Sequence, residues 1–467
     1  MSSNNKNIDR RGFLKIFGGG AAALSLANCA PKTSSSASSS DESSLGEVPK
    51  DKMEYRTTTT KGDKLSLLGY GCMRWPLLKT PAEDGNIIDQ EATNELVDYA
   101  IEHGVNYFDT APPYLQGWCE KATGTALKRH PRDKYFIATK LSNANKAYWS
   151  REESLKMYYN SFKSLQVDYI DYMLLHTVGA GSWENFKARF LDNGILDFLI
   201  EEREAGRIRN LGFSFHGDIK VFEYLLDRHE EIGWDFAMIQ LNYKDWNYAD
   251  ETSKNNTDAR HLYEELAKHN IDVIIMEPLL GGRLANLPEH LSNMLKAEEP
   301  NDSLAKWAFR YAASHPKVIT VLSGMAYKEH LQENIRTYSP LKWISEEENH
   351  LLMNVAKLMI EYPIIECTAC QYCMPCPYGV DIPTIFTHYN KCISENRFPQ
   401  SSQDKNYREA RRAFLIGYDR KVEKLRQADH CIGCGECEEH CPQKLTIHKY
   451  LRQVNDYVES LKQETLE

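Results

Sequence analysis

"GVNYFDTAPPY", residues 104–114, joins a run of apolar and aromatic residues to a polar end that carries Asp109 and Tyr114. The run has the length and composition of a buried strand. Seven similar runs lie between residues 65 and 324, and stretches with helical spacing, such as 88–104, separate them. Eight strands that alternate with helices predict a parallel sheet, and this length suits a closed (β/α)8 barrel, the TIM barrel.

The alternative α/β arrangement is a doubly wound open sheet. Such a sheet normally has a Gly-rich G-x-G-x-x-G turn after its first strand, and the sequence has none there. We therefore expect the barrel over residues 53–340. The chain of 467 residues exceeds what one ordinary core uses, so residues 341–467 are assigned to a second, smaller domain.

Charge and hydropathy exclude two classes of protein. The net charge is −10 and no basic block occurs, which argues against a nucleic-acid partner. No run of 18 apolar residues occurs, so no segment has the length of a membrane-spanning helix.

Four polar residues lie at the ends of successive predicted strands: Asp109, Tyr114, Lys140 and His176. A tyrosine has an ordinary pKa near 10, which a neighbouring lysine ammonium would lower. An aspartate would hold that lysine, and a histidine would orient the substrate oxygen. Such a group suits proton donation to a carbonyl that receives hydride. The alternative is that these are four unrelated polar residues at strand ends. That interpretation suffices for any one of them alone, but not for all four together.

The segments "GVNYFDTAPPY", "FIATK" (136–140) and "DYMLLH" (171–176) resemble, in order, the signature segments of the aldo-keto reductase family. Residues 53–76 resemble its opening hairpin and first strand. The resemblance covers roughly residues 53–338. It implies that Tyr114 is the proton donor, that Asp109, Lys140 and His176 complete the tetrad, and that NADP(H) binds without a Rossmann fold.

The resemblance also assigns residues to the nucleotide. Ser214 and Gln240 match the positions that hold the carboxamide, and Glu333 and Asn334 match those near the adenine. The other residues expected at the nucleotide are Gly71, Leu279, Gly281, Ser323 and Gly324. The sequence departs from the family where Phe215 replaces an Asn, where Met276 replaces a stacking aromatic residue, and where Gly324 and His330 fall near the usual 2′-phosphate grip. NADP(H) and NAD(H) are therefore both candidate cofactors, and a flavin is the alternative.

Eight of the twelve cysteines lie in two clusters after residue 366. "CIGCGECEEHCP" (431–442) has the C-x2-C-x2-C-x3-C-P spacing of bacterial ferredoxins. "ECTACQYCMPCP" (366–377) has the same three-cysteine core, with its fourth cysteine one residue early. A zinc ribbon has no use for a third cysteine at the same step, and a disulfide framework would spread its cysteines along the chain. We expect two [4Fe-4S] clusters.

In two-cluster ferredoxins the fourth cysteine of each motif binds the other cluster. The expected first ligand set is therefore Cys367, Cys370, Cys373 and Cys441. The expected second set is Cys431, Cys434, Cys437 and Cys376. An uncrossed pairing is the alternative.

Residues 406–429, between the motifs, and the stretches on either side of the motifs have helical patterns, so a small helical ferredoxin-like domain is expected. The arrangement resembles the helical ferredoxin module of respiratory iron–sulfur subunits. The order of barrel and two cysteine motifs resembles a bacterial subgroup of aldo-keto reductase-like proteins with ferredoxin tails.

The N-terminal residues predict an export signal over residues 1–30. Arg10 and Arg11, followed by "FLK" at 13–15, resemble a twin-arginine signal, read by the Tat translocase. "LANC" at 26–29 resembles a lipobox, so Cys29 is a candidate for lipidation and for the chain's only membrane contact. Ser-rich residues 31–52 predict a flexible linker. The expected location is the periplasm or cell envelope, on the outer side of the cytoplasmic membrane if Cys29 is lipidated.

Two functions are consistent with these features. The first is an oxidoreductase that interconverts a small carbonyl and an alcohol at the tetrad and exchanges electrons, through two [4Fe-4S] clusters, with a redox partner protein or a quinone-linked carrier. The second is an exported iron–sulfur electron-transfer protein whose barrel is a non-catalytic docking scaffold.

Overall fold

A computed structural model describes residues 47–252, 256–360 and 364–466. The predicted signal peptide, Cys29 and all of the predicted linker up to residue 46 lie outside the described residues.

The eight expected strands form and close into a barrel in which every neighbouring pair is parallel. The strand order is β10-β3-β4-β5-β6-β7-β8-β9. The strands are β3 (Leu68–Gly71), β4 (Tyr107–Asp109), β5 (Phe136–Leu141), β6 (Ile170–Val178), β7 (Ile208–Phe215), β8 (Phe236–Gln240), β9 (Asp272–Met276) and β10 (Val318–Ser323). All nine residues of β6 are buried, as expected where helices cover the outside of a barrel and side chains fill its inside. The predicted TIM barrel is confirmed.

The strand register brings the predicted catalytic positions to one end of the barrel. Asp109 is the last residue of β4 and pairs with Gly71 and Ala138, while Lys140 of β5 pairs with Leu174 of β6. Because all strands are parallel, residues late in each strand share the carboxyl-terminal edge, where barrel enzymes place their chemistry.

A two-stranded antiparallel hairpin precedes the barrel. It consists of β1 (Tyr55–Thr57) and β2 (Lys64–Ser66), in agreement with the expected opening hairpin. Asp63, in its turn, accepts hydrogen bonds from Arg209 at 2.8 Å and from Tyr172 at 3.0 Å. The hairpin is thereby bonded to two barrel strands through side chains that the carboxyl-terminal site does not use.

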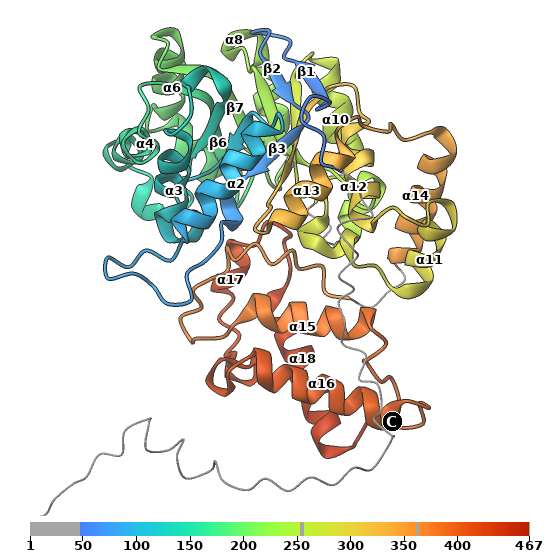
Figure 1. The fold of residues 1–467 in the computed structure, drawn as a ribbon. Coiled ribbons are helices and arrows are strands. Elements are labelled where there is room, and N and C mark those ends of the chain that lie inside the picture. The colour runs from blue at the N-terminus through green and yellow to red at the C-terminus, as the bar shows by residue number, and fades with distance from the viewer. Residues whose placement is uncertain (1–46, 253–255, 361–363, 467) are drawn as a thin grey trace, which may run out of the picture. The chain divides into compact units, whose positions relative to one another are not determined.

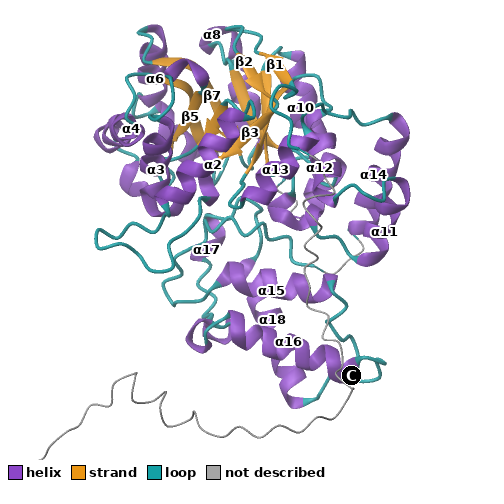
Figure 2. Cartoon of the chain, in the orientation of Figure 1, coloured by secondary structure: helices purple, strands orange, loops and turns teal. Residues whose placement is uncertain are grey.

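Helices surround the barrel, as Figure 2 shows. The longer ones are α2 (Gln90–Glu102), α3 (Trp118–Leu127), α4 (Arg151–Leu165), α6 (Ile195–Glu204), α7 (Ile219–Asp227), α10 (Ala259–Lys268), α11 (Glu289–Glu298), α12 (Leu304–Ala313) and α13 (Lys328–Thr337). The shorter ones include α5 (Trp183–Phe186), α8 (His229–Ile232) and α9 (Asp245–Thr252). α2 begins where the Asp89 carboxylate accepts the Ala92 N–H at 3.0 Å, and it stops before Gly104, whose φ of 89° suits glycine.

The C-terminal region is helical, as predicted. It contains α15 (Ile382–Ser394), α16 (Tyr407–Lys421), α17 (Glu436–Glu439) and α18 (Ile447–Gln463), coloured orange to red in Figure 1. α15, α16 and α18 pack on one another around their own buried core, which includes Phe386, Phe414 and Val454.

One further helix, α14 (Glu346–Met359), packs against the barrel. Its buried Leu352, Val355 and Met359 belong to the hydrophobic core of the barrel. Across the described residues, no helix is both long and apolar enough to cross a membrane.

Candidate active site

The four predicted catalytic side chains line one cavity of about 530 Å³ at the carboxyl-terminal edge of the barrel. Asp109 ends β4, Lys140 lies near the end of β5, and His176 lies in β6. Tyr114 begins a short 3₁₀ turn after β4, so two of the four come from one strand and the loop that follows it. The four positions therefore lie together in space, as expected.

Lys140 is held in place by two acceptors. Its Nζ donates to Asp109 Oδ1 at 2.5 Å and to the carbonyl of Thr110 at 2.8 Å. Both charged side chains are nearly inaccessible, with 1% of the lysine and 4% of the aspartate exposed. Burial raises the pKa of Asp109, and the Lys140 ammonium acts against that rise. The pair fixes a positive charge beside Tyr114.

The effect on Tyr114 differs from the sequence expectation. Lys140 Nζ lies 5.1 Å from the centre of the Tyr114 ring. The pKa of Tyr114 is nevertheless well above its ordinary value, because burial and the neighbouring Tyr372 and Asp109 all disfavour the phenolate. The expected lowering of this pKa by lysine is outweighed: the Lys140 ammonium is bonded to Asp109, and the Asp109 charge acts on Tyr114 in the opposite direction. Tyr114 holds its proton, as a proton donor must.

His176 is buried and neutral. Its Nδ1 lies 2.6 Å from Ser142 Oγ, and its Nε2 lies 3.3 Å from the hydroxyl of Tyr372. Burial, with a further contribution from Lys140, lowers the pKa of His176 well below its ordinary value. A neutral ring with an engaged Nδ1 presents Nε2 to the cavity.

The same cavity is lined by every residue that the resemblance assigned to the nucleotide, namely Gly71, Ser214, Gln240, Leu279, Gly281, Ser323, Gly324, Glu333 and Asn334. Ser214 Oγ accepts the Thr177 N–H at 2.9 Å, and Asn334 Nδ2 donates to Ser323 Oγ at 3.0 Å. The residues at the carboxamide and adenine positions thus lie around one continuous space, together with the tetrad.

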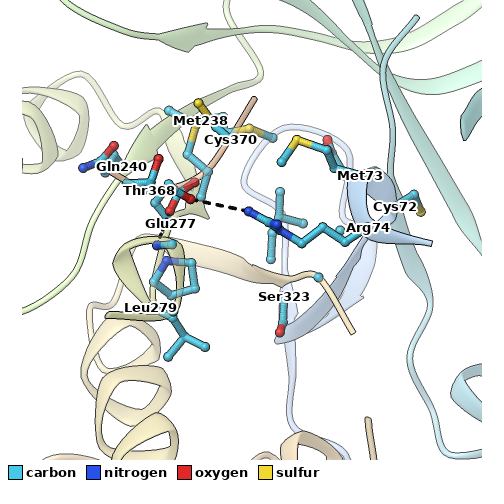
Figure 3. A pocket seen from close by; sticks show the side chains of 18 of the residues that line it. Cys72, Met73, Arg74, Met238, Gln240, Glu277, Leu279, Ser323, Thr368 and Cys370 are labelled. Atoms are coloured by element: carbon cyan, nitrogen blue, oxygen red, sulfur yellow. Dashed lines mark hydrogen bonds between the residues drawn. The ribbon is translucent and has the colours of Figure 1, made fainter. Parts of the chain in front are cut away.

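Five residues of the cysteine segments also line this cavity: Thr368, Cys370, Tyr372, Pro442 and Gln443. Figure 3 shows Thr368 and Cys370 beside barrel residues such as Glu277 and Met238. Gln443 Nε2 donates to Gln240 Oε1 at 2.8 Å, so the side chain at the expected carboxamide position is bonded to the C-terminal region. Nothing in the sequence indicated this covering.

Arg74, which the sequence did not single out, joins the first barrel loop to the first cysteine loop. Its Nη2 donates to the carbonyl of Ala369 at 3.3 Å and lies 3.5 Å from that of Thr368, the contact drawn in Figure 3. Burial raises the pKa of Glu277, which lines the same cavity, and Arg74 acts against that rise.

The eight predicted cluster cysteines surround two further cavities. A small one is lined by Cys367, Cys370, Cys373 and Cys441. A second, of about 300 Å³, is lined by Cys376, Cys431, Cys434 and Cys437, with Cys373 between the two. These groups coincide with the crossed ligand sets. No three Cys, His, Asp or Glu side chains among the described residues form a group suited to one metal ion. A [4Fe-4S] cluster has a different requirement, four thiolates around a wider space.

The two cysteine loops have the same backbone turn. Ala369 and Gln371 have φ of 52° and 68°, and the equivalent positions in the second loop, Gly433 and Gly435, have φ of 77° and 80°. Left-handed residues between cysteines direct backbone N–H groups inward. The Ala369 N–H donates to Cys367 Sγ at 3.4 Å, a contact of the kind that tunes iron–sulfur sites.

Comparisons with known proteins agree with both halves of the chain. The sequence model of the aldo/keto reductase family matches residues 67–351, and that of the 4Fe-4S dicluster domain matches residues 366–447.

Individual relatives cover the barrel. L-galactose dehydrogenase of Arabidopsis thaliana is 26% identical over 317 residues, 64% of this chain and 92% of that protein. NADH-specific methylglyoxal reductase of Escherichia coli is 26% identical over 309 residues, 58% of this chain and 89% of that protein. Among solved structures, aldo-keto reductase AKR11C1 from Bacillus halodurans has a TM-score of 0.52 at 23% identity and covers 65% of this chain and 96% of its own. The chain belongs to the aldo/keto reductase family, as an oxidoreductase that carries an iron–sulfur domain after its barrel.

Proposed function

We propose that the protein interconverts a small carbonyl and an alcohol at Tyr114 and exchanges the electrons with a redox partner through two [4Fe-4S] clusters. The observation that carries this proposal is the position of Cys370, which lines both the tetrad cavity and the small cysteine cavity. A tail attached for stability alone would have no reason to present a cluster ligand to the catalytic cavity.

Each tetrad residue has a role that follows from its contacts. Tyr114 donates its proton to the substrate oxygen during reduction and takes it back during oxidation. Lys140 stabilises the phenolate that forms transiently, and Asp109 holds Lys140. His176 directs Nε2 toward the substrate oxygen. The oxidation of one alcohol releases two electrons and two protons, and when bound, a nicotinamide or flavin would supply hydride chemistry and the clusters one-electron transfer.

The cofactor in the barrel is proposed to be NADP(H) or NAD(H), with a flavin as the alternative. The cavity of about 530 Å³ and the nine nucleotide positions around it support a bound dinucleotide. Gly324 and His330 line the part where a 2′-phosphate grip is expected, and neither carries the fixed positive charge of Lys or Arg. Mass spectrometry of the cofactor released after anaerobic isolation decides among the three.

The cysteine sets are proposed to hold the clusters in the crossed arrangement. Cys373 lines both cysteine cavities, and Cys370 connects the first of them to the barrel. Cys434, a ligand of the second set, is exposed, whereas Cys441 of the first set is buried. We therefore propose that the second cluster meets the partner, a redox protein or a quinone-linked carrier.

We also propose export by the twin-arginine route, on the strength of Arg10 and Arg11 and the apolar run that follows them. That route would allow clusters to be loaded before export. Lipidation at Cys29 is a second proposal, tested by mass spectrometry of the mature N-terminus.

Iron and sulfide analysis tests the clusters. Wild-type protein isolated without oxygen should contain about eight of each per chain. Cys370→Ala should lose about four irons because it removes one ligand of the first set, while Cys392→Ala, a buried cysteine outside both sets, should keep all of them. Zinc in place of iron would contradict the proposal.

The electron path is tested by adding NADH or NADPH to the oxidised protein in the absence of oxygen. The visible absorbance of the clusters should fall in the wild type. Clusters that stay oxidised, in a protein from which neither nicotinamide nor flavin is released, would refute exchange between the two halves.

A further inference from the structure

Tyr372 belongs to the first cysteine loop, between Cys370 and Cys373, yet its side chain lies in the barrel cavity. Its hydroxyl is 3.3 Å from His176 Nε2, and Tyr372 lies close enough to Tyr114 to contribute to the raised pKa of that residue. The rings of Tyr114 and Tyr372 each meet the His176 ring edge-on, with centres 6.0 and 6.2 Å from it. Tyr372 thus contacts His176 and lies beside Tyr114, the two tetrad groups that face the substrate.

Those two groups define where a carbonyl oxygen has to bind. Proton transfer from Tyr114 requires the substrate oxygen within hydrogen-bond reach of its hydroxyl, and His176 Nε2 can orient the same atom. The phenol oxygen of Tyr372 takes the contact with His176 Nε2 and belongs to a side chain that lies beside Tyr114. Two oxygen atoms cannot share one such position, since hydrogen-bonded oxygens stay about 2.7 Å apart.

We propose that Tyr372 occupies the position of the substrate's carbonyl oxygen and is the residue that determines which carbonyls the barrel accepts. The inference rests on the proposed function, because it takes Tyr114 as the proton donor. A substrate reaches the tetrad only by displacing the Tyr372 hydroxyl, so carbonyls without further binding contacts are turned over slowly.

The backbone around Tyr372 is held, which makes the side chain the part that moves. Arg74 binds the carbonyl of Ala369, and Gly281 approaches Thr368 so closely that a Cβ at that glycine would lie 2.4 Å from the Cα of Thr368. Displacement by rotation of the tyrosine side chain leaves Cys370 and Cys373 in place. The clusters can then stay assembled while the substrate enters.

This arrangement has a consequence for electron flow. A hydride donor bound in the barrel cavity would be protected from adventitious aldehydes by the same loop that carries the proposed cluster ligands. Electrons would thereby be kept for the clusters unless the specific substrate is present.

The test compares Tyr372→Ala and Tyr372→Phe with wild type, using 4-nitrobenzaldehyde and the nicotinamide that the protein binds. Tyr372→Ala should raise kcat/KM by about tenfold or more, because the substrate no longer has to break the hydrogen bond of Tyr372. Tyr372→Phe should give a smaller gain, since the ring remains. The gain should appear mainly as a lower KM. Tyr148→Ala, which changes an exposed tyrosine, is the matched control and should behave as wild type.

Two measurements keep the inference separate from the proposed function. Binding of 4-nitrobenzaldehyde, followed by tryptophan fluorescence without nucleotide, should tighten in Tyr372→Ala at unchanged iron content. Equal affinities would overturn the inference whatever the turnover. If binding tightens but no variant turns over the aldehyde, the proposed function is wrong, while the inference that Tyr372 occupies the position of the carbonyl oxygen is supported. A gain in turnover that survives a second change, Tyr114→Phe, would also overturn the inference.

Discussion

At the scale of single residues, one carboxylate oxygen of the Lys140–Asp109 pair lacks a hydrogen bond. Asp109 Oδ1 accepts the lysine, whereas Oδ2 is buried without a hydrogen-bond partner. Such an oxygen is costly to bury, so the carboxylate is retained for the charge that it places beside Lys140. The pair is therefore more sensitive to loss of charge than to loss of shape.

The isosteric change Asp109→Asn tests this interpretation. Lys140 would lose the carboxylate that fixes its ammonium beside Tyr114 and would no longer be positioned to stabilise the tyrosinate, so the turnover of a carbonyl substrate should fall by about 100-fold. The measurement is kcat in the Tyr372→Ala background, where turnover is expected to be highest.

The control is Asp98→Asn, which removes an exposed carboxylate that pairs with Arg129 on the barrel surface. It should leave the rate unchanged. An unaltered rate in Asp109→Asn would show that the charge of this residue has no part in the reaction.

How far the sequence predicts the site depends on the kind of residue. Asp109, Lys140 and His176 were accessible to prediction because parallel strands bring their carboxyl-terminal ends to one edge. Tyr372 and Arg74 were not. Tyr372 occupies a variable position of a cysteine motif, and only the placement of that loop over the barrel gives its hydroxyl a partner.

At the scale of elements, the start of α14 combines a helix cap with a buried ion pair. Ser345 and Glu348 form a capping box, and the same carboxylate accepts a hydrogen bond at 2.6 Å from Arg310 of α12, which is fully buried. Burial by itself would raise the pKa of Glu348. The bonds from Arg310, the Ser345 N–H and Lys342 outweigh it and lower that pKa to about 2.

Glu348→Gln should therefore destabilise the protein in a pH-dependent way. The folded-state pKa lies below that of the unfolded chain, so the stabilisation is complete above about pH 5 and is lost as the pH falls toward 2. We expect a loss of about 2 kcal/mol near neutral pH. The difference in unfolding free energy between wild type and variant should be smaller at about pH 4 than near neutral pH.

Thermal unfolding followed by calorimetry at the two pH values measures this difference. Glu346→Gln, an exposed acid in the same helical turn, is the control and should show no such trend. A difference that stays constant with pH would mean that the carboxylate charge does not stabilise α14.

The sequence also predicts some helices and turns better than others. α16 and α18 were predicted from long helical periodicity. α15 was not, since the β-branched residues of its first two turns have low helix propensity, and its packing against α16 and α18 decides; Pro383 lies in the first turn, where proline is accepted. The left-handed turns of the second cysteine loop agree with its glycines, whereas Ala369 and Gln371 of the first give no such signal.

At the scale of the whole molecule, the feature that sequence could not supply is the attachment of the first cysteine segment to the barrel. Arg283 binds both carboxylate oxygens of Glu366, and Lys244 Nζ lies 3.6 Å from the same group. Both cations are largely buried, with 10% and 1% of their side chains exposed. Only the folded barrel brings these two cations together, opposite a glutamate that immediately precedes the first cluster ligand.

The attachment predicts the effect of Glu366→Gln. Removal of the charge would take from Arg283 and Lys244 the carboxylate that they share, at a cost of about 2 kcal/mol to the docked state. The segment from residue 364 to 373 should then open about thirtyfold more often, and hydrogen–deuterium exchange measured without oxygen should report faster exchange at its backbone amides. Glu231→Gln, which breaks an exposed pair with Arg228, is the matched control.

Cluster reduction by nicotinamide should slow in Glu366→Gln while iron content stays at about eight per chain, because the ligands remain and only their distance from the barrel cavity fluctuates more. Equal exchange and equal reduction rates in the two variants would show that Glu366 does not hold the proposed electron path together.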